Sequence, residues 1–159
     1  LGDLLHGRDG LTPALDDAVR RWRLSHQATQ IDWLPGNHDA RLQRVAAQWH
    51  MRLLPSLAPL APGLSACHEP PPAPLRQFLL CGHLHPALTL RVAADRVRVP
   101  CFVARRGSLL LPAFGSWTGG AELSSAQLDE PGTRIALAAG DRLVWLRATD
   151  VDPRAGGRN

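Results

Sequence analysis

Lysine is absent from this chain of 159 residues, so all 18 of its basic side chains are arginines. Because alanine and proline are also abundant, the arginine content is typical of a G- and C-rich genome and is weak evidence of function. The net charge of +4 still suits a partner that carries phosphate. Cysteine is scarce, and its odd number of three gives no disulfide framework, which predicts a reducing compartment and a cytoplasmic protein. No apolar run approaches the length of a membrane span, so no membrane partner is expected.

Methionine occurs once, at Met51, and the chain begins with Leu1. We therefore expect a segment to precede Leu1, and the lack of a visible signal peptide is not informative. The length is sufficient for one domain with a hydrophobic core, which we expect over residues 1–150. Residues 151–159 are rich in glycine and arginine and are predicted to form a disordered tail. The sequence leaves the oligomeric state open.

The most informative stretch is the Leu-Pro-Gly-Asn-His-Asp run at residues 34–39. The apolar residues 31–34 predict a buried strand before it, and the spacing of apolar residues over 39–49 predicts a helix after it. The run is therefore a turn at the carboxyl end of a strand, where ligands gather in open α/β sheets. This turn offers an amide, an imidazole and a carboxylate for metal binding and acid–base chemistry: Asn37, His38 and Asp39.

Three further apolar runs end in residues of similar chemistry. Asp3 follows a glycine and is either a turn residue, the commoner role, or a carboxylate that bridges two metal ions. His68 lies where the strand predicted over 63–67 would end. His83 and His85 follow an apolar run, and imidazoles two residues apart can point to the same side. A single histidine is usually a surface or hydrogen-bonded core residue, but two directly after a strand favour a site.

The remaining segments predict one more helix and several strands. Thr12 is a plausible N-cap for a helix that ends near Ser25. The loop at residues 112–120 is glycine-rich and is either a plain connection or a wall of an active-site cleft. Arg105 and Arg106 are either a phosphate contact or a solvated turn. The predicted strands lie at 51–54, 88–92, 97–103, 108–111, 133–137 and 142–146, with Gly140-Asp141 as the turn of a hairpin.

Five side chains with oxygen or nitrogen donors thus fall at the ends of predicted strands. If those strands are neighbours in a sheet, the donors converge on one edge and suit Mn²⁺, Fe or Zn²⁺ more than a cysteine-type structural zinc site. A set of this size can hold two metals roughly 3.5–4 Å apart, which lower the pKa of a bridging water and hold a phosphoryl group for in-line attack. His38, held by Asp39, could then protonate the leaving oxygen. The five donors are Asp3, Asn37, His68, His83 and His85.

The order and spacing of these motifs resemble the calcineurin-like metallophosphoesterase family. Within it the chain is similar to the bacterial ligase-associated DNA damage response endonucleases of the PdeM type. The family likeness rests on Gly2-Asp3, on Gly-Asn-His-Asp at 36–39, on His68 and on Gly-His-Leu-His at 82–85. The subgroup likeness rests on residues 67–70 (Cys-His-Glu-Pro), 81–86, 100–102, 111–115 and 118–120.

This resemblance implies a fold, a metal centre and a partner. The fold would be a four-layer α/β/β/α sandwich with two sheets face to face and helices outside. Asp3 would bridge two divalent metals, of which manganese is the first expectation. Asn37, His68 and His83 would complete one metal, His85 would bind the other, and His38 would be catalytic. The substrate would be a phosphodiester such as DNA or RNA, with a functional link to a DNA ligase in DNA repair.

One feature of the family is missing from this chain. Family members open with a strand that carries an Asp-x-His motif, which supplies two ligands to the metal that His85 would bind, and the sequence has no such motif. We expect the chain to be a fragment that lacks this first strand, and expect it to be less stable because a sheet edge would be unpaired. The alternative is a protein of the same fold that is catalytically inactive and acts as a metal-binding or DNA-repair adaptor module.

Overall fold

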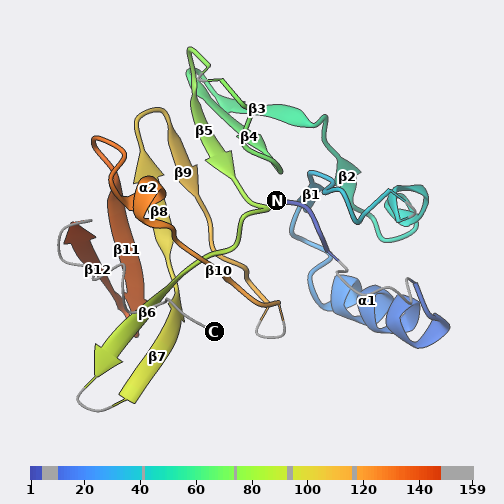
Figure 1. Cartoon of the computed structure of the whole chain (residues 1–159). Coiled ribbons are helices and arrows are strands. Elements are labelled where there is room, and N and C mark those ends of the chain that lie inside the picture. Colours follow the sequence, from blue (N-terminus) through green and yellow to red (C-terminus); the bar gives the residue numbers. More distant parts are fainter. Residues whose placement is uncertain (5–10, 41, 74, 93–94, 116–117, 148–159) are drawn as a thin grey trace.

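The computed structural model in Figure 1 describes residues 1–4, 11–40, 42–73, 75–92, 95–115 and 118–147. The tail predicted for residues 151–159 lies outside these ranges. Within them, mixed β-sheets predominate and helices are few. Neither of the described α-helices is long and apolar enough to cross a membrane.

The largest sheet has seven strands in the order β12-β11-β8-β9-β5-β4-β3. Its central pairs β4–β5 and β5–β9 are parallel, and the other pairs are antiparallel. The carboxyl ends of three strands therefore meet at one edge. The strands are β3 (Leu57–Ala61), β4 (Leu64–Cys67), β5 (Phe78–Cys81), β8 (Phe102–Arg105), β9 (Ser108–Leu110), β11 (Arg134–Ala139) and β12 (Arg142–Arg147).

Two smaller sheets accompany it. The order of the three-stranded sheet is β10-β6-β7, from β10 (Ala121–Glu122), β6 (Pro86–Val92) and β7 (Asp95–Pro100). The parallel pair β1 (Asp32–Trp33) and β2 (Arg52–Leu53) lies on the other side of the molecule, next to α1 (Pro13–Ser25). The remaining helices are the 3-10 helix η1 (Gln43–Val45) and the short α2 (Ser125–Leu128).

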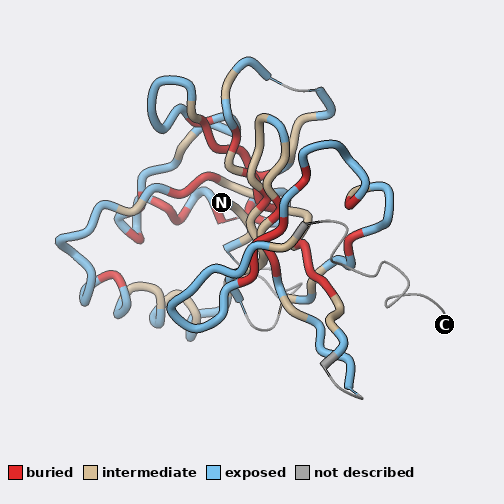
Figure 2. Tube along the Cα trace, turned by 90° about the vertical axis from the view of Figure 1, so that its left-hand side faces the viewer, coloured by how far each residue is buried: buried red, intermediate tan, exposed pale blue. Residues whose placement is uncertain are grey.

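The main hydrophobic core lies on one face of the seven-stranded sheet. Cys101, Val103 and Ile135 are fully buried there, with Leu88 of β6 and Leu128 of α2 packed against them. This packing joins the two larger sheets around one core. Figure 2 shows that the buried segments meet in the middle of the molecule, whereas its protruding loops are exposed.

A second cluster holds α1 against the β1–β2 pair. Trp33 and Trp49 stack with their ring centroids 6.0 Å apart, and Val19 of α1 packs against this cluster. The Trp49 indole N–H donates to Asp16 at 2.6 Å, and the buried Arg23 guanidinium donates to the Trp49 carbonyl at 3.1 Å. These bonds fix α1 to the segment that follows the central turn.

The sequence predictions for α1 and most strands are confirmed. Thr12 accepts a hydrogen bond from the Leu15 N–H, as an N-cap does. Gly140, with φ of 63°, occupies the first of two loop positions between β11 and β12, as the predicted hairpin requires. The strand predicted over 97–103 is wrong in extent, because β7 ends at Pro100 and β8 begins at Phe102.

The helix predicted over 39–49 is also wrong. Of its described residues, 40, 42 and 46–49 form turns and residues 43–45 form a 3-10 helix. Several of its hydrogen bonds join residues three apart, such as Val45 N–H to the Leu42 carbonyl at 2.9 Å. Apolar residues of this segment are nevertheless buried, among them Leu42, Val45 and Trp49. Residues three apart lie on the same side of a 3-10 helix as well as of an α-helix. The apolar spacing therefore does not distinguish the two.

Candidate metal centre

The candidate donors lie on segments that meet at one edge of the seven-stranded sheet. His68 directly follows β4 and His83 follows β5 by one glycine, and these strands are parallel neighbours with Cys67 opposite Cys81. The turn that contains Asn37 comes after β1. Residues 1–4 lie between these two parts, which is visible from the position of the N-terminus in Figure 1.

Asp3, His68 and His83 form the group of potential ligands in the described part of the chain. One ligand atom from each lies within 4.8 Å of the others. His68 Nε2 is at the centre, 3.0 Å from Asn37 Oδ1, 3.1 Å from His83 Nδ1 and 3.4 Å from Asp3 Oδ2. Ligand atoms that each bind one metal at about 2.0–2.2 Å lie about 3–4 Å from one another, so this spacing fits a metal ion.

The tautomer of His68 supports the same interpretation. Its Nδ1 lies 2.8 Å from the carbonyl oxygen of Leu1, which can only accept a hydrogen bond. In the neutral imidazole Nδ1 therefore carries the hydrogen, and the lone pair of Nε2 points toward Asn37 and Asp3. A histidine that donates its second nitrogen to a carbonyl while the first faces other acceptors is typical of a metal ligand. A cation would relieve the repulsion among these acceptor atoms.

Glycines allow this close approach. A Cβ on Gly2 would overlap His68 Nδ1 and the backbone of Gly36, and a Cβ on Gly36 would overlap the carboxylate of Asp3. A Cβ on Gly82 would lie 2.9 Å from the carbonyl oxygen of Leu1. The three positions explain the chemical role of glycine in the Gly-Asp, Gly-Asn-His-Asp and Gly-His-Leu-His motifs, since any side chain would push the donors apart.

Backbone strain is concentrated at the same place. Asp3, His83 and His85 have φ values of 53°, 65° and 44°, in the left-handed region that non-glycine residues adopt rarely. Among the described residues, His50 is the other non-glycine residue in this region. Strain of this kind persists where surrounding contacts impose it, and it often accompanies function.

Asp39 holds the central turn together. Its carboxylate is fully buried and accepts hydrogen bonds from Gly36 N–H at 2.8 Å, Leu4 N–H at 3.0 Å and the Trp33 indole N–H at 3.2 Å. These bonds join β1, the turn and the N-terminal segment. The sequence interpretation gave Asp39 the role of holding His38, and the geometry adds this structural role.

The other predicted site residues are distributed around the group. His38 is exposed beside it, and its backbone N–H donates to Asp3 Oδ1 at 3.1 Å. His85 lines the same cavity as the group but is not one of its three ligands. Arg105 lies outside this cavity and forms an ion pair with Glu130 at 3.2 Å, and its neighbour Arg106 is exposed.

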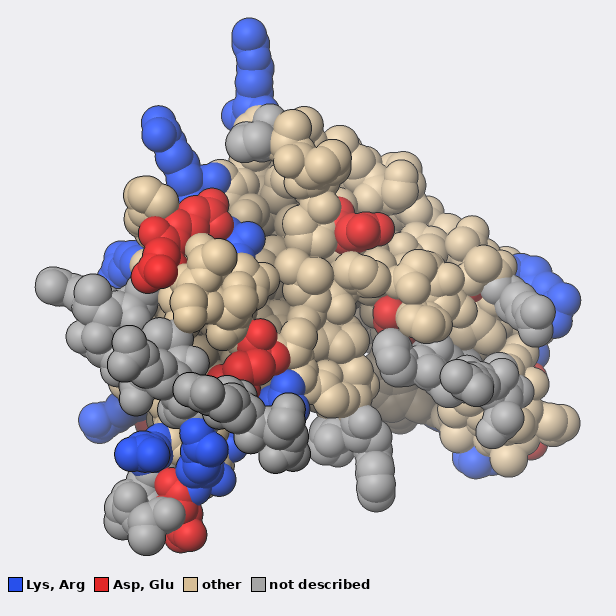
Figure 3. All heavy atoms as spheres, viewed as in Figure 1, with Lys and Arg blue, Asp and Glu red and all other residues tan. Residues whose placement is uncertain are grey.

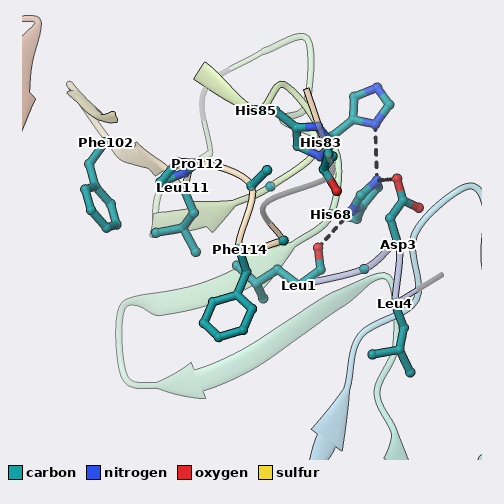
Figure 4. A pocket seen from close by; sticks show the side chains of 15 residues that line it. Leu1, Asp3, Leu4, His68, His83, His85, Phe102, Leu111, Pro112 and Phe114 are labelled. Carbon is teal, nitrogen blue, oxygen red and sulfur yellow. Dashed lines mark hydrogen bonds and ion pairs between the residues drawn. The ribbon is translucent and has the colours of Figure 1, made fainter. Parts of the chain in front are cut away.

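The group opens into a cavity of about 690 Å³. Figure 4 shows the donor side chains on one side of it and apolar side chains on the other. The apolar side includes Phe102, Leu111 and Phe114, so the glycine-rich loop is a cavity wall, one of the two roles that the sequence left open. The Leu1 carbonyl was missed because backbone atoms leave no signal in a sequence.

The three cysteines are free and buried, and none belongs to the group of potential ligands in the described part of the chain. Cys67 and Cys81 directly precede His68 and Gly82, and their sulfurs lie 3.3 Å apart. Burial raises the pKa of the Cys81 thiol to about 12, and the neighbouring Cys67 adds to the rise. Burial likewise raises the pKa of the Cys101 thiol to about 12. The ligand atoms of the group are thus oxygen and nitrogen.

Comparisons with known proteins place a solved nuclease structure among those similar to this chain. No protein-family model matches the chain, and no curated protein matches it in sequence. Among solved structures, the crystal structure of the Pseudomonas putida nuclease MPE matches with a TM-score of 0.73 and 34% identity. The match covers 92% of this chain and 68% of that one. The chain therefore belongs to the same family as the Pseudomonas putida nuclease MPE.

Proposed function

We propose that this protein is a metal-dependent phosphodiesterase of the calcineurin-like metallophosphoesterase type that hydrolyses nucleic acid. The observation that carries the proposal is the group of Asp3, His68 and His83, with Asn37 beside it, at the wall of an open cavity. The 34% identity to a nuclease supports a nucleic-acid substrate. In this proposal the two larger sheets are the inner layers of a four-layer sandwich.

Two divalent metal ions would be held by these residues. Asp3, Asn37, His68 and His83 would hold one ion, and Asp3 and His85 would contribute to the other. All of these ligands are oxygen or nitrogen donors, which suit manganese first and iron or zinc as alternatives. When bound, such ions neutralise charge on a phosphoryl group and lower the pKa of water.

His38 would act on the leaving group. It is exposed, lies one residue beyond Asn37, and has its backbone tied to the carboxylate of Asp3. An imidazole at this place can donate a proton to the leaving oxygen of a diester. Asp39 would be a positioning residue, because its carboxylate holds the backbone of the turn that presents His38.

The test is manganese-dependent hydrolysis of bis-p-nitrophenyl phosphate, measured together with metal content by mass spectrometry. We expect His38→Ala to lower turnover by about 100-fold or more while bound metal is unchanged. Asp3→Asn and His83→Ala should lower metal content itself. The matched control is His26→Ala, since His26 is an exposed histidine outside the cavity. Metal loss in His38→Ala equal to that in His83→Ala would make His38 a ligand and refute its assignment.

The alternative is a metal-binding module of the same fold that does not catalyse. It is favoured by one observation, that a single group of three ligands forms among the described residues and His85 lies outside it. One bound metal per chain without hydrolysis of the diester would support this alternative. For both the nuclease and the non-catalytic module, we propose a partnership with a DNA ligase, a role in DNA repair and a cytoplasmic location.

A further inference from the structure

Phe114 is an unusually exposed aromatic residue for one that lines a cavity. Its relative exposure is 108%, so none of the described residues shields the ring. The same side chain is part of the wall of the cavity that contains the metal-ligand group. In Figure 4 the ring extends from its loop on the apolar side, across the cavity from Asp3 and His68. The ring is therefore an apolar surface that a ligand bound in this cavity can reach.

The sheet explains why Phe114 lines the cavity that contains the metal-ligand group. β5 and β9 are parallel neighbours with Cys81 opposite Leu110, and the Leu111 N–H donates to the Cys81 carbonyl at 2.8 Å. His83 lies two residues beyond one strand end, and Phe114 lies four residues beyond the other. Both therefore leave the same edge of the sheet side by side, where parallel strands present their ligands.

The backbone that leads to Phe114 is restricted on its N-terminal side. Pro112 has a fixed φ and lies two residues before the ring. Leu111 and Phe102 line the same cavity and extend its apolar side. The ring itself is fully exposed, so a base that stacks on it would order the side chain when it binds.

We infer that Phe114 stacks on the nucleobase next to the phosphodiester that the metal-ligand group would hold. The inference rests on the proposed function and adds a substrate-positioning residue to it. A nucleotide carries a planar base with an apolar face and a charged phosphate. The base would lie on the apolar side of the cavity and the phosphate on the polar side. The cavity volume of about 690 Å³ is within the range that holds a ligand as large as a nucleotide. Stacking accepts every base, so no base preference is expected at this position.

The experiment combines a protein variant with a changed substrate. One fluorescein-labelled oligodeoxynucleotide has all its bases, and a second has abasic residues on both sides of the phosphate that the wild-type protein cleaves. The variants are Phe114→Leu, which keeps an apolar side chain without the ring, and Phe114→Trp, which keeps a stacking surface. The matched control is Phe78→Leu, because Phe78 is 40% exposed at the start of β5, outside the cavity.

We expect Phe114→Leu to lower kcat/KM about 5- to 150-fold on the intact oligonucleotide and less than about 2-fold on the abasic one. Phe114→Trp should retain most of the activity on the intact oligonucleotide, and Phe78→Leu should match the wild type on both. Metal content should be unchanged in all three variants. Equal losses on the intact and abasic substrates would overturn the inference, and so would a Phe114→Trp protein as weak as Phe114→Leu.

A binding measurement separates this inference from the proposed function. Fluorescence anisotropy in EDTA gives the affinity for each oligonucleotide in the absence of cleavage. If the wild-type protein cleaves neither substrate, the nuclease proposal fails. The stacking inference then stands only if Phe114→Leu weakens binding of the intact oligonucleotide and leaves binding of the abasic one unchanged. Equal affinities of wild type and variant for the intact oligonucleotide would refute it.

Discussion

Replacement of Asp39 should destabilise the protein more when more of its hydrogen bonds are lost. The buried carboxylate accepts three, one at Oδ1 from Leu4 N–H and two at Oδ2 from Gly36 N–H and the Trp33 indole N–H. A hydrogen bond to a charged group contributes about 1.5–3 kcal/mol, and a buried donor left without its acceptor is costly. The structure therefore predicts a graded response.

Asp39→Asn can keep one oxygen toward Gly36 and Trp33 and loses the acceptor for Leu4. We expect it to lower the free energy of unfolding by about 2 kcal/mol. Asp39→Ala loses all three acceptors and leaves a small cavity, and we expect a loss of about 4 kcal/mol. Urea unfolding followed by tryptophan fluorescence measures both values, because Trp33 and Trp49 are buried. Asp17→Asn, an exposed site on α1, should change the free energy of unfolding by less than about 0.5 kcal/mol.

Two results would refute this reasoning. Equal destabilisation by the Asn and Ala variants would show that the bonds to Oδ2 contribute nothing. A loss of less than about 1 kcal/mol in both would show that the carboxylate does not hold the turn. The pH dependence of diester hydrolysis separates the structural role of Asp39 from a role in tuning His38. If Asp39 positions only the backbone, Asp39→Asn should lower the rate without moving the midpoint of the profile.

Four further outcomes can be checked with simple assays. Gly36→Ala should abolish tight manganese binding in an equilibrium dialysis measurement because its methyl group would overlap a ligand carboxylate, whereas Gly119→Ala, with open space around it, should bind normally. Cys81 and Cys101 should react slowly with iodoacetamide in the native protein at pH 8, since their pKa values are raised to about 12. Between about pH 9 and pH 12 these thiols stay protonated in the folded protein but ionise in the unfolded chain. The free energy of unfolding should therefore fall as the pH rises through this range. A urea midpoint that stays constant over the range would contradict the raised pKa values. Thr12→Ala should lower the free energy of unfolding by about 1 kcal/mol through loss of the α1 cap, and an unchanged urea midpoint would show that α1 does not need it.

Local patterns were sufficient to locate the elements that carry the donors. An apolar run followed by glycine and a histidine marks a strand end because strand preference and turn chemistry are properties of a few adjacent residues. Thr12 and Pro13 marked the start of α1 for the same reason. The segment at 39–49 was misjudged because apolar spacing reports which side chains are buried and does not report how the backbone is hydrogen-bonded.

The sequence by itself determined which chemistry the protein can carry: the donors, their order along the chain, and the glycines that let them approach one another. The tertiary structure alone decided which of them meet. His68 is oriented by the carbonyl of a residue 67 positions away, and Asp39 is joined to Leu4 over 35 positions. Phe114 and His83 line one cavity because β9 pairs with β5 in one register. Such contacts depend on the packing of distant segments, and no window of adjacent residues contains that information.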